Sequence, residues 1–156
     1  MPPEATLARQ SSLGYQVNHI ARLFAQALRV RIEPHGVVPG QFAQLLALYE
    51  EDGITQNELC ARVRIDQSTM AHTLKRMERD GLIERVPDPA DRRRSIITLT
   101  DRADSLRGTM IEAAKAVNAA ATRDLDADET ATYLALSTRL IANLEPGTPL
   151  EGTDSP

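Results

Sequence analysis

Three consecutive arginines, Arg92, Arg93 and Arg94, form the densest cluster of positive charge in the chain. They follow a turn-forming run at 87–91, so we expect them at the tip of an exposed loop. Guanidinium groups on such a loop can enter the minor groove of duplex DNA, where the negative potential stabilises them. Asp88 and Asp91 are placed to hold the loop in shape by pairing with an arginine. This segment therefore indicates binding to a polyanion.

A second group of hydrogen-bond donors falls on a helix predicted from about Gln67 to Asp80. Its apolar face should pack inward and holds Met70, Thr73, Leu74 and Met77. The opposite face carries hydroxyls, an imidazole and cations, from Ser68, Thr69, His72, Lys75, Arg76 and Arg79. Such groups donate hydrogen bonds to phosphates and to base edges in the major groove. A solvated amphipathic helix explains this face equally well, but the arginine loop favours contact with DNA.

The elements before this helix can be predicted from periodicity and capping. Apolar residues three and four apart indicate a long helix from Leu13 to a Pro-Gly break at 33–36. A second helix fits 39–53, which opens with Pro-Gly and closes with Asp-Gly. A capping box formed by Thr55 and Glu58 then starts a short third helix.

The pattern changes after the fourth helix. Asp66 caps that helix and Gly81 ends it as a left-handed residue. Short β-type runs at 82–86 and 95–99 flank the charged loop and predict a β-hairpin. Thr100-Asp101 then caps a long helix, and a cluster of acidic residues from Asp126 onward caps the last one.

Together these elements predict a mainly α-helical protein with a small β-hairpin wing. Two short helices and a hairpin, at 37–100, form a winged helix-turn-helix, in which the second short helix enters the major groove. The helices at 1–36 and 101–145 carry apolar stripes without an obvious partner in so small a domain, and are predicted to form a dimer interface. Packing within one chain would explain about half of these stripe residues. The tail at 146–156 is predicted to be disordered.

At these residues the chain resembles the MarR family of bacterial regulators. The resemblance covers roughly residues 10–145, and its ordered segments are 55–59, 66–70, 77–85, 88–94 and 99–100. It implies that Asp91 orients Arg93 for a minor-groove contact, and that Ser68 and Thr69 supply hydroxyls at the start of the recognition helix. His72 stands where the family often has arginine, which leaves the fold unchanged but alters the expected DNA preference.

The resemblance also implies a dimer regulated by a small molecule. A two-fold dimer presents two recognition helices about one helical turn apart, so the operator should be an imperfect inverted repeat. Family members bind phenolic or other anionic molecules between the dimer helices and the winged domain. Tyr15, His19 and Arg22 are the polar side chains expected near that junction. Ordinary surface or interface roles would explain each of the three as well.

Composition and the absence of known motifs narrow the classes of protein to which this chain could belong. The net charge is −4, but residues 55–100 hold nine Lys and Arg against seven Asp and Glu, whereas the rest holds nine against fifteen. We find no Gly-rich phosphate loop, nucleophile elbow or zinc-protease pattern, and predict neither an enzyme nor a cofactor. One cysteine, Cys60, and three scattered histidines argue against a disulfide or a metal site. The opening residues do not resemble a secretory signal, and no apolar run could cross a membrane, so we predict a cytoplasmic protein.

The sequence thus predicts a homodimeric transcriptional regulator, most simply a repressor, that binds an inverted-repeat operator in duplex DNA under control of a small effector. The alternative is a winged-helix module that binds proteins and not DNA. The arginines of the loop argue against this alternative, because a protein-binding wing does not need them.

Overall fold

The computed structural model describes residues 8–147, and the chain divides into two compact units between Val117 and Asn118. The first unit opens with a short 3₁₀ helix, η1 (Arg9–Ser11), and then α1 (Leu13–Ile32). α1 ends in a second 3₁₀ turn, η2 (Glu33–His35), closed by Gly36 at φ +76°. The predicted break after the first long helix is confirmed.

Three helices build the centre of the first unit: α2 (Pro39–Glu50), α3 (Gln56–Val63) and α4 (Gln67–Arg79). The capping box that starts α3 is confirmed: the amide of Glu58 donates to Thr55 Oγ1 over 3.2 Å, and the amide of Thr55 donates to Glu58 Oε2 over 2.7 Å. Asp66 caps α4 as predicted, because its Oδ1 accepts from the amide of Thr69 over 2.8 Å. The two short helices of the helix-turn-helix therefore begin where the sequence places them.

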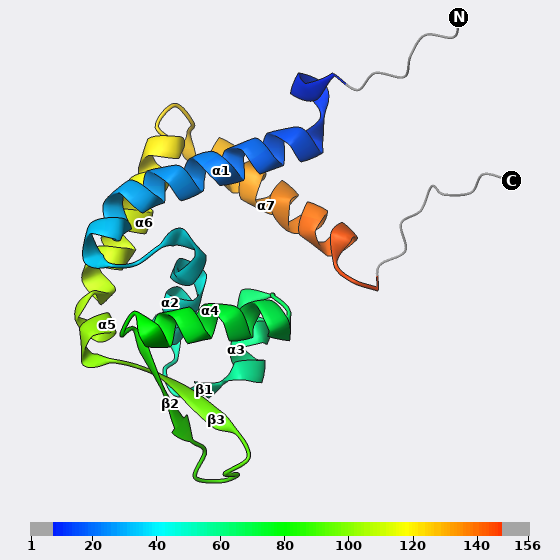
Figure 1. Ribbon diagram of the computed structural model, residues 1–156. Helices are drawn as coiled ribbons and strands as arrows, with labels where there is room; N and C mark the ends of the chain where they lie inside the picture. The colour runs from blue at the N-terminus through cyan, green and yellow to red at the C-terminus, as the bar shows by residue number, and fades with distance from the viewer. Residues whose placement is uncertain (1–7, 148–156) are drawn as a thin grey trace, which may run out of the picture. The chain divides into compact units, whose positions relative to one another are not determined.

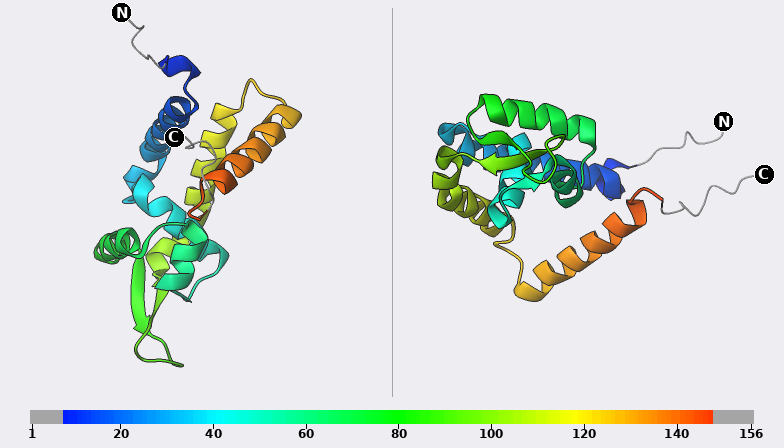
Figure 2. Two further views of the ribbon diagram at one scale, coloured as in Figure 1. Left: turned by 90° about the vertical axis from the view of Figure 1, so that its right-hand side faces the viewer. Right: turned by 90° about the horizontal axis from the view of Figure 1, so that it is seen from below.

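A small antiparallel sheet adjoins these helices, with strand order β1-β3-β2. The hairpin consists of β2 (Ile83–Pro87) and β3 (Ser95–Leu99), paired from Ile83 opposite Leu99 to Pro87 opposite Ser95. It extends away from the helices of its own unit as an arm (Figures 1 and 2). The third strand, β1 (Ile54–Thr55), was not predicted from the sequence, because two residues carry no periodicity and form a strand only by pairing with β3.

The single long helix predicted from Asp101 is interrupted, and that prediction was wrong. The structure has α5 (Asp101–Ser105) and α6 (Arg107–Ala121), with Leu106 between them. The amide of Leu106 is shared between the carbonyl oxygens of Arg102 at 3.3 Å and Ala103 at 3.2 Å, which tightens this turn. The side chain of Arg107 reaches sideways to the carbonyl of Tyr49, at the end of α2, and its guanidinium lies 4.7 Å from the Tyr49 ring centroid.

The core joins the winged domain to the start of the following helices. Among its fully buried members are Leu45, Leu48, Leu59, Met70, Leu74, Met77, Leu82, Ile97 and Met110. Ala103 and Ala113 belong to the same cluster. Part of the segment at 101–145 therefore packs within its own chain.

The second unit contains α7 (Ala127–Leu144), and α6 crosses the boundary between the units. Asp126 and Glu129 form the capping box of α7 as the acidic cluster predicted. Several large apolar side chains of α7 are exposed, including Tyr133, Leu134, Leu136 and Ile141. The predicted disorder of the tail concerns residues that, from 148 onward, lie outside the described part of the chain. Among the described helices, none has the length and apolar character needed to span a bilayer.

The buried face of α4 generates a stability prediction. Leu74 is 0% exposed in the core, so Leu74→Ala should lower the free energy of unfolding by about 2–5 kcal/mol, measured by urea denaturation. Leu74→Met is the matched control and should cost less than about 1.5 kcal/mol, because it conserves volume. Equal losses in both variants would contradict the placement of this side chain.

Candidate nucleic-acid interface

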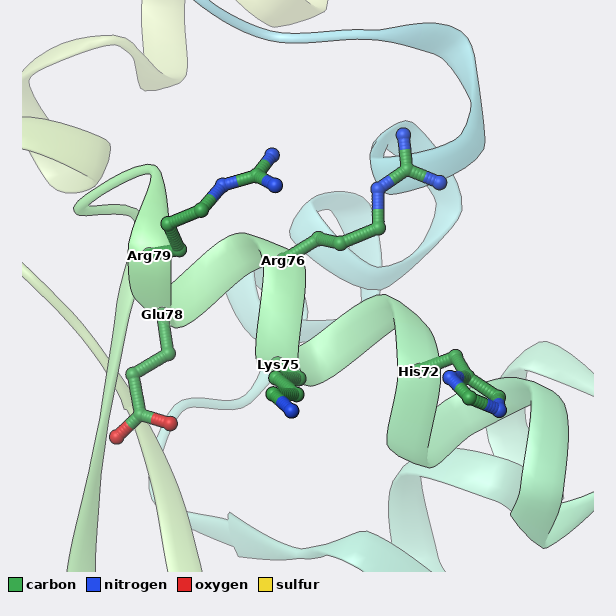
Figure 3. A pocket seen from close by; sticks show the side chains of 5 residues that line it. All are labelled: His72, Lys75, Arg76, Glu78 and Arg79. Carbon is green, nitrogen blue, oxygen red and sulfur yellow. The ribbon is translucent and has the colours of Figure 1, made fainter.

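The outer face of α4 presents the side chains that the sequence assigned to DNA. Ser68, His72, Lys75, Arg76 and Arg79 are all exposed, whereas Met70, Leu74 and Met77 are completely buried. Five side chains of α4 line a surface hollow (Figure 3), namely His72, Lys75, Arg76, Glu78 and Arg79. In the described part of the chain, the side chains of His72, Lys75 and Arg76 form no hydrogen bond or ion pair. They are therefore available to a ligand.

The five side chains do not all point the same way. Figure 3 shows Arg76 and Arg79 extending to one side of the helix, and Glu78 extending to the other side, toward the strands. Arg79 is already engaged, because its Nε donates to Asp80 Oδ1 over 2.9 Å. This bond and the nearby carboxylate raise the pKa of Arg79. Lys75 and His72 lie between the two directions and form the central donors of the face (Figure 3).

Asp66 orders the N-terminal end of α4. Its carboxylate accepts from the amide of Thr69 over 2.8 Å and from the Thr69 hydroxyl over 2.7 Å. The amide bond and then the hydroxyl bond hold the pKa of Asp66 below its usual value. The hydroxyl proton of Thr69 is already donated to Asp66, so the Thr69 hydroxyl can only accept a hydrogen bond from a ligand. The hydroxyl of Ser68 is exposed and can still donate one.

A compact set of bonds closes the C-terminal end of α4. The amide of Leu82 donates to the carbonyl of Met77 over 2.9 Å, and the amide of Gly81 donates to the carbonyl of Glu78 over 3.1 Å. Gly81 lies at φ +71°, so this is the Schellman arrangement expected of a left-handed glycine after the helix. Asp80 is also held from α2, because Gln41 Nε2 donates to its Oδ2 over 2.8 Å. The bonds from Arg79 and then Gln41 lower the pKa of Asp80.

The three arginines at the tip of the hairpin differ in their contacts, since Arg94 forms ion pairs within the loop and Arg92 and Arg93 do not. Arg94 pairs with Asp88 at 3.5 Å and with Asp91 at 4.0 Å. Asp88 is largely buried, and it also accepts from the amide of Ala90 over 2.8 Å. The expectation that the loop acids hold its shape by pairing with an arginine is confirmed. Arg94 is the arginine that is anchored.

The relation of Asp91 to Arg93 differs from the one that the resemblance implied. Asp91 Oδ1 accepts from the backbone amide of Arg93 over 3.0 Å, and the ion pair of Asp91 is made with Arg94. The reason is the tight turn, in which the amide of Arg94 donates to the Asp91 carbonyl and so brings its side chain over the acid. Among residues 8–147, Arg92 and Arg93 have exposed side chains without an ion pair.

Sequence reasoning missed a polar network that joins three elements of this surface. Arg85 on β2 lies 3.6 Å from the carboxylate of Glu78, and its Nη1 donates to Gln56 Oε1 over 3.3 Å. Gln56, at the start of α3, donates to Gln67 Oε1 over 3.0 Å, at the start of α4. The alternation of side chains along β2 could have indicated this network. Arg85 lies two residues after the buried Ile83, so its side chain is on the same, inward face of the strand.

The three residues predicted to bind an effector lie on α1. The rings of Tyr15 and His19 meet edge to face, with centroids 6.1 Å apart and an angle of 63° between their planes. Tyr15 also lines a small surface hollow with Ala8, Arg9 and Gln10. Arg22 lies one turn beyond His19, and the structure does not place it in that hollow.

Cys60 is buried on α3, and burial raises the pKa of its thiol. This environment fits a structural thiol better than a reactive one. Among the described residues, no three His, Cys, Asp or Glu side chains gather at ligand spacing.

The caps of α3 and α4 generate a pH prediction. The folded pKa of Asp66, Glu58 and Asp80 is lowered, so their stabilisation is complete above the unfolded values near pH 4 and is lost as the pH falls through the folded ones. Asp66→Asn keeps an N-cap acceptor but removes one of these titrations. Between about pH 5 and pH 3, its melting temperature should therefore fall less than that of the wild type.

The control is Asp124→Asn, which removes a carboxylate that is 92% exposed and should leave the pH profile of the melting temperature unchanged. Parallel acid profiles for wild type and Asp66→Asn would contradict the role of this cap.

Comparison with known proteins adds to this geometry. Residues 35–94 match the MarR family. The chain is 35% identical over 100 residues to the HTH-type transcriptional regulator TtmR of Methylorubrum extorquens, a match that covers 64% of this chain and 51% of the relative. It is 29% identical over 130 residues to the HTH-type transcriptional repressor NicR of Pseudomonas putida, which covers 81% and 82% of the two chains. The match with TtmR thus spans only about half of the length of that relative.

A solved structure gives the same result for the fold. The PcaV transcriptional regulator from Streptomyces coelicolor, in complex with its natural ligand, superposes with a TM-score of 0.79 at 28% identity, over 88% of this chain and 97% of that one. Both of these relatives, TtmR and NicR, are named as transcriptional regulators. The matched segment at 35–94 contains α2, α3, α4 and the loop with its three arginines. The family match at 35–94, the relatives and the shared fold agree with one another, so this part of the chain is similar to MarR-family regulators.

Proposed function

We propose that this protein is a homodimeric transcriptional repressor that binds an inverted-repeat operator in duplex DNA. In this proposal α4 lies in the major groove and the tip of the hairpin reaches the adjacent minor groove. The DNA contacts come from Ser68, Thr69, His72, Lys75, Arg76, Arg79, Arg92 and Arg93, while Asp91 and Arg94 shape the loop. The protein acts in the cytoplasm, where its operator would lie.

The observation that carries the proposal is the unpaired basic surface on α4 and the hairpin. His72, Lys75, Arg76, Arg92 and Arg93 are exposed, and their side chains make no hydrogen bond or ion pair within residues 8–147. The acids nearby are neutralised, because Glu78 pairs with Arg85 and Asp80 pairs with Arg79. A phosphate backbone would supply the anions that this surface lacks.

Regulation by a small molecule is supported by the relatives and by α1. PcaV, which shares the fold, was solved with its natural ligand, and NicR is named a repressor. We propose that an aromatic or anionic effector binds near Tyr15 and His19, where an aromatic pair and a neighbouring arginine, Arg22, offer stacking and charge. Such an effector changes DNA affinity only if it binds one conformation of the dimer more tightly than the other.

DNA binding should show a defined dependence on salt. Arg93→Ala should weaken binding of the dimer to every duplex and reduce the slope of log K against log salt by about two units, because each of the two protomers loses one phosphate contact. Fluorescence anisotropy on labelled duplex DNA measures this slope. Lys115→Ala, an exposed cation on α6, is the control and should leave the slope unchanged. If wild type and Arg93→Ala share one slope, Arg93 lies outside the interface.

Dimerisation should depend on the apolar side of α1. Leu13, Val17, Ile20 and Phe24 recur every three or four residues, and each is at least 36% exposed. The double variant Val17→Lys, Phe24→Lys should be monomeric in sedimentation velocity at concentrations where the wild type is a dimer, because two charges would have to be buried. Asn18→Lys, Gln26→Lys adds the same charge on the other side of α1 and should remain dimeric. A dimer in the first variant would remove α1 from the interface.

A further inference from the structure

At the C-terminal end of α4, one backbone carbonyl accepts a hydrogen bond from a side chain that is distant in the sequence. The Schellman bonds use the carbonyls of Met77 and Glu78, and the carbonyl of Arg76 accepts from the amide of Asp80 over 2.9 Å. The carbonyl of Asp80 accepts instead from Nη1 of Arg102, over 3.0 Å. Arg102 lies on α5, 22 residues further along the chain. A cation at this position also complements the helix dipole.

The same guanidinium reaches the turn that follows α1. Arg102 Nη2 donates to the carbonyl of His35, in η2, over 2.7 Å. The neighbouring Gly36 makes this approach possible, since a Cβ at position 36 would lie 2.5 Å from Arg102 Nη2. Gly36 is also left-handed, at φ +76°. One side chain therefore holds two carbonyls, that of Asp80 directly after α4 and that of His35 in η2, the turn after α1.

Arg102 projects from a fixed base. Thr100, the N-cap of α5, donates from its hydroxyl to the carbonyl of Gly81 over 2.7 Å and accepts from the amide of Ala103 over 3.1 Å. Its own amide donates to the carbonyl of Leu82 over 3.2 Å. Ala103 is fully buried in the core. The first turn of α5 is thus locked onto the residues that follow α4, which limits how far the guanidinium can move.

We propose that Arg102 is a positioning residue for DNA recognition, which sets the orientation of α4 relative to α1 by bonding the carbonyls of Asp80 and His35 at once. The proposal rests on the DNA-binding function proposed above and deepens it. If α1 forms the dimer interface, the distance between the two recognition helices depends on how each α4 is held to its own α1. Arg102 then contributes to the spacing of operator half-sites without touching DNA.

The test compares discrimination between duplexes with overall affinity. The probes are a duplex selected by the wild-type protein from a random pool, the same duplex with its half-sites moved apart by one base pair, and a scrambled duplex. Arg102→Gln should bind the selected duplex about tenfold more weakly, keep its affinity for the scrambled duplex, and lose most of the preference for the native spacing. Arg102→Lys keeps a cation that can donate and should recover part of that preference.

A glycine pair separates the guanidinium from backbone strain. Gly36→Ala should reproduce Arg102→Gln, because the new methyl group would displace Nη2. Gly53→Ala is the matched control: Gly53 has a similar φ of +72°, but its added Cβ would meet only Ile96 Cγ2 at an ordinary 3.8 Å. It should bear a similar backbone cost and keep the wild-type spacing preference. Lys115→Gln controls for the loss of one positive charge.

The outcomes are distinct. A spacing preference that falls in Arg102→Gln and Gly36→Ala, but persists in Gly53→Ala and Lys115→Gln, supports the proposal. Equal losses on all three duplexes indicate a reduced folded fraction and overturn it, as does an equal effect of the two glycine variants. If the wild type binds none of the duplexes, the proposed function itself fails.

Discussion

The burial of one face of α4 is the constraint on which the rest of the surface depends. Met70, Leu74 and Met77 are each 0% exposed, and their spacing of four and three places them on one side of the helix. A rotation of α4 by one residue, about 100°, would bring Lys75 or Ser68 toward the core and would leave a buried cation or hydroxyl without a partner. The apolar face therefore determines which side chains are exposed for the proposed contact with DNA, and it supplies the rigid support that recognition by short directional bonds requires.

Charge is arranged so that an acidic chain presents a basic surface. The net charge is −4, yet the acids of α4 and the wing tip are all engaged: Asp66 caps the helix, Glu78 pairs with Arg85, and Asp88 pairs with Arg94. Each of these acids stabilises local structure and at the same time removes a repulsion against phosphate. The unpaired cations that remain on this surface are consequently more effective than the total charge suggests.

Capping patterns and periodicity in adjacent residues predicted the helices and the hairpin. The features that were not predicted depend on contacts between elements that are distant in the sequence. Capping boxes, the glycine after α4 and the alternation of the hairpin are written in adjacent residues, so their positions were confirmed to within a residue or two. β1 exists only through its pairing with β3, and the interruption at Leu106 accompanies contacts of Arg107 with α2. The outer face of α4 followed from the helical period, whereas the link from Arg85 to Gln56 spans 29 residues and left only a register signal. Likewise, the partner of Asp91 depended on turn geometry that a motif does not specify.

The two ends of α4 differ in how they respond to movement elsewhere. Asp66 is bonded to Thr69 of its own helix, so this N-terminal cap moves with α4 as one body. The C-terminal end is bonded through Arg102 to His35, which belongs to the turn after α1. Apolar contacts such as those of Ile32 tolerate small sliding motions, but hydrogen bonds weaken steeply with angle and distance. A displacement of α1, whether by a partner or a ligand, would therefore be felt first at the C-terminal end of α4, and would change the tilt of this helix before it changed its internal structure.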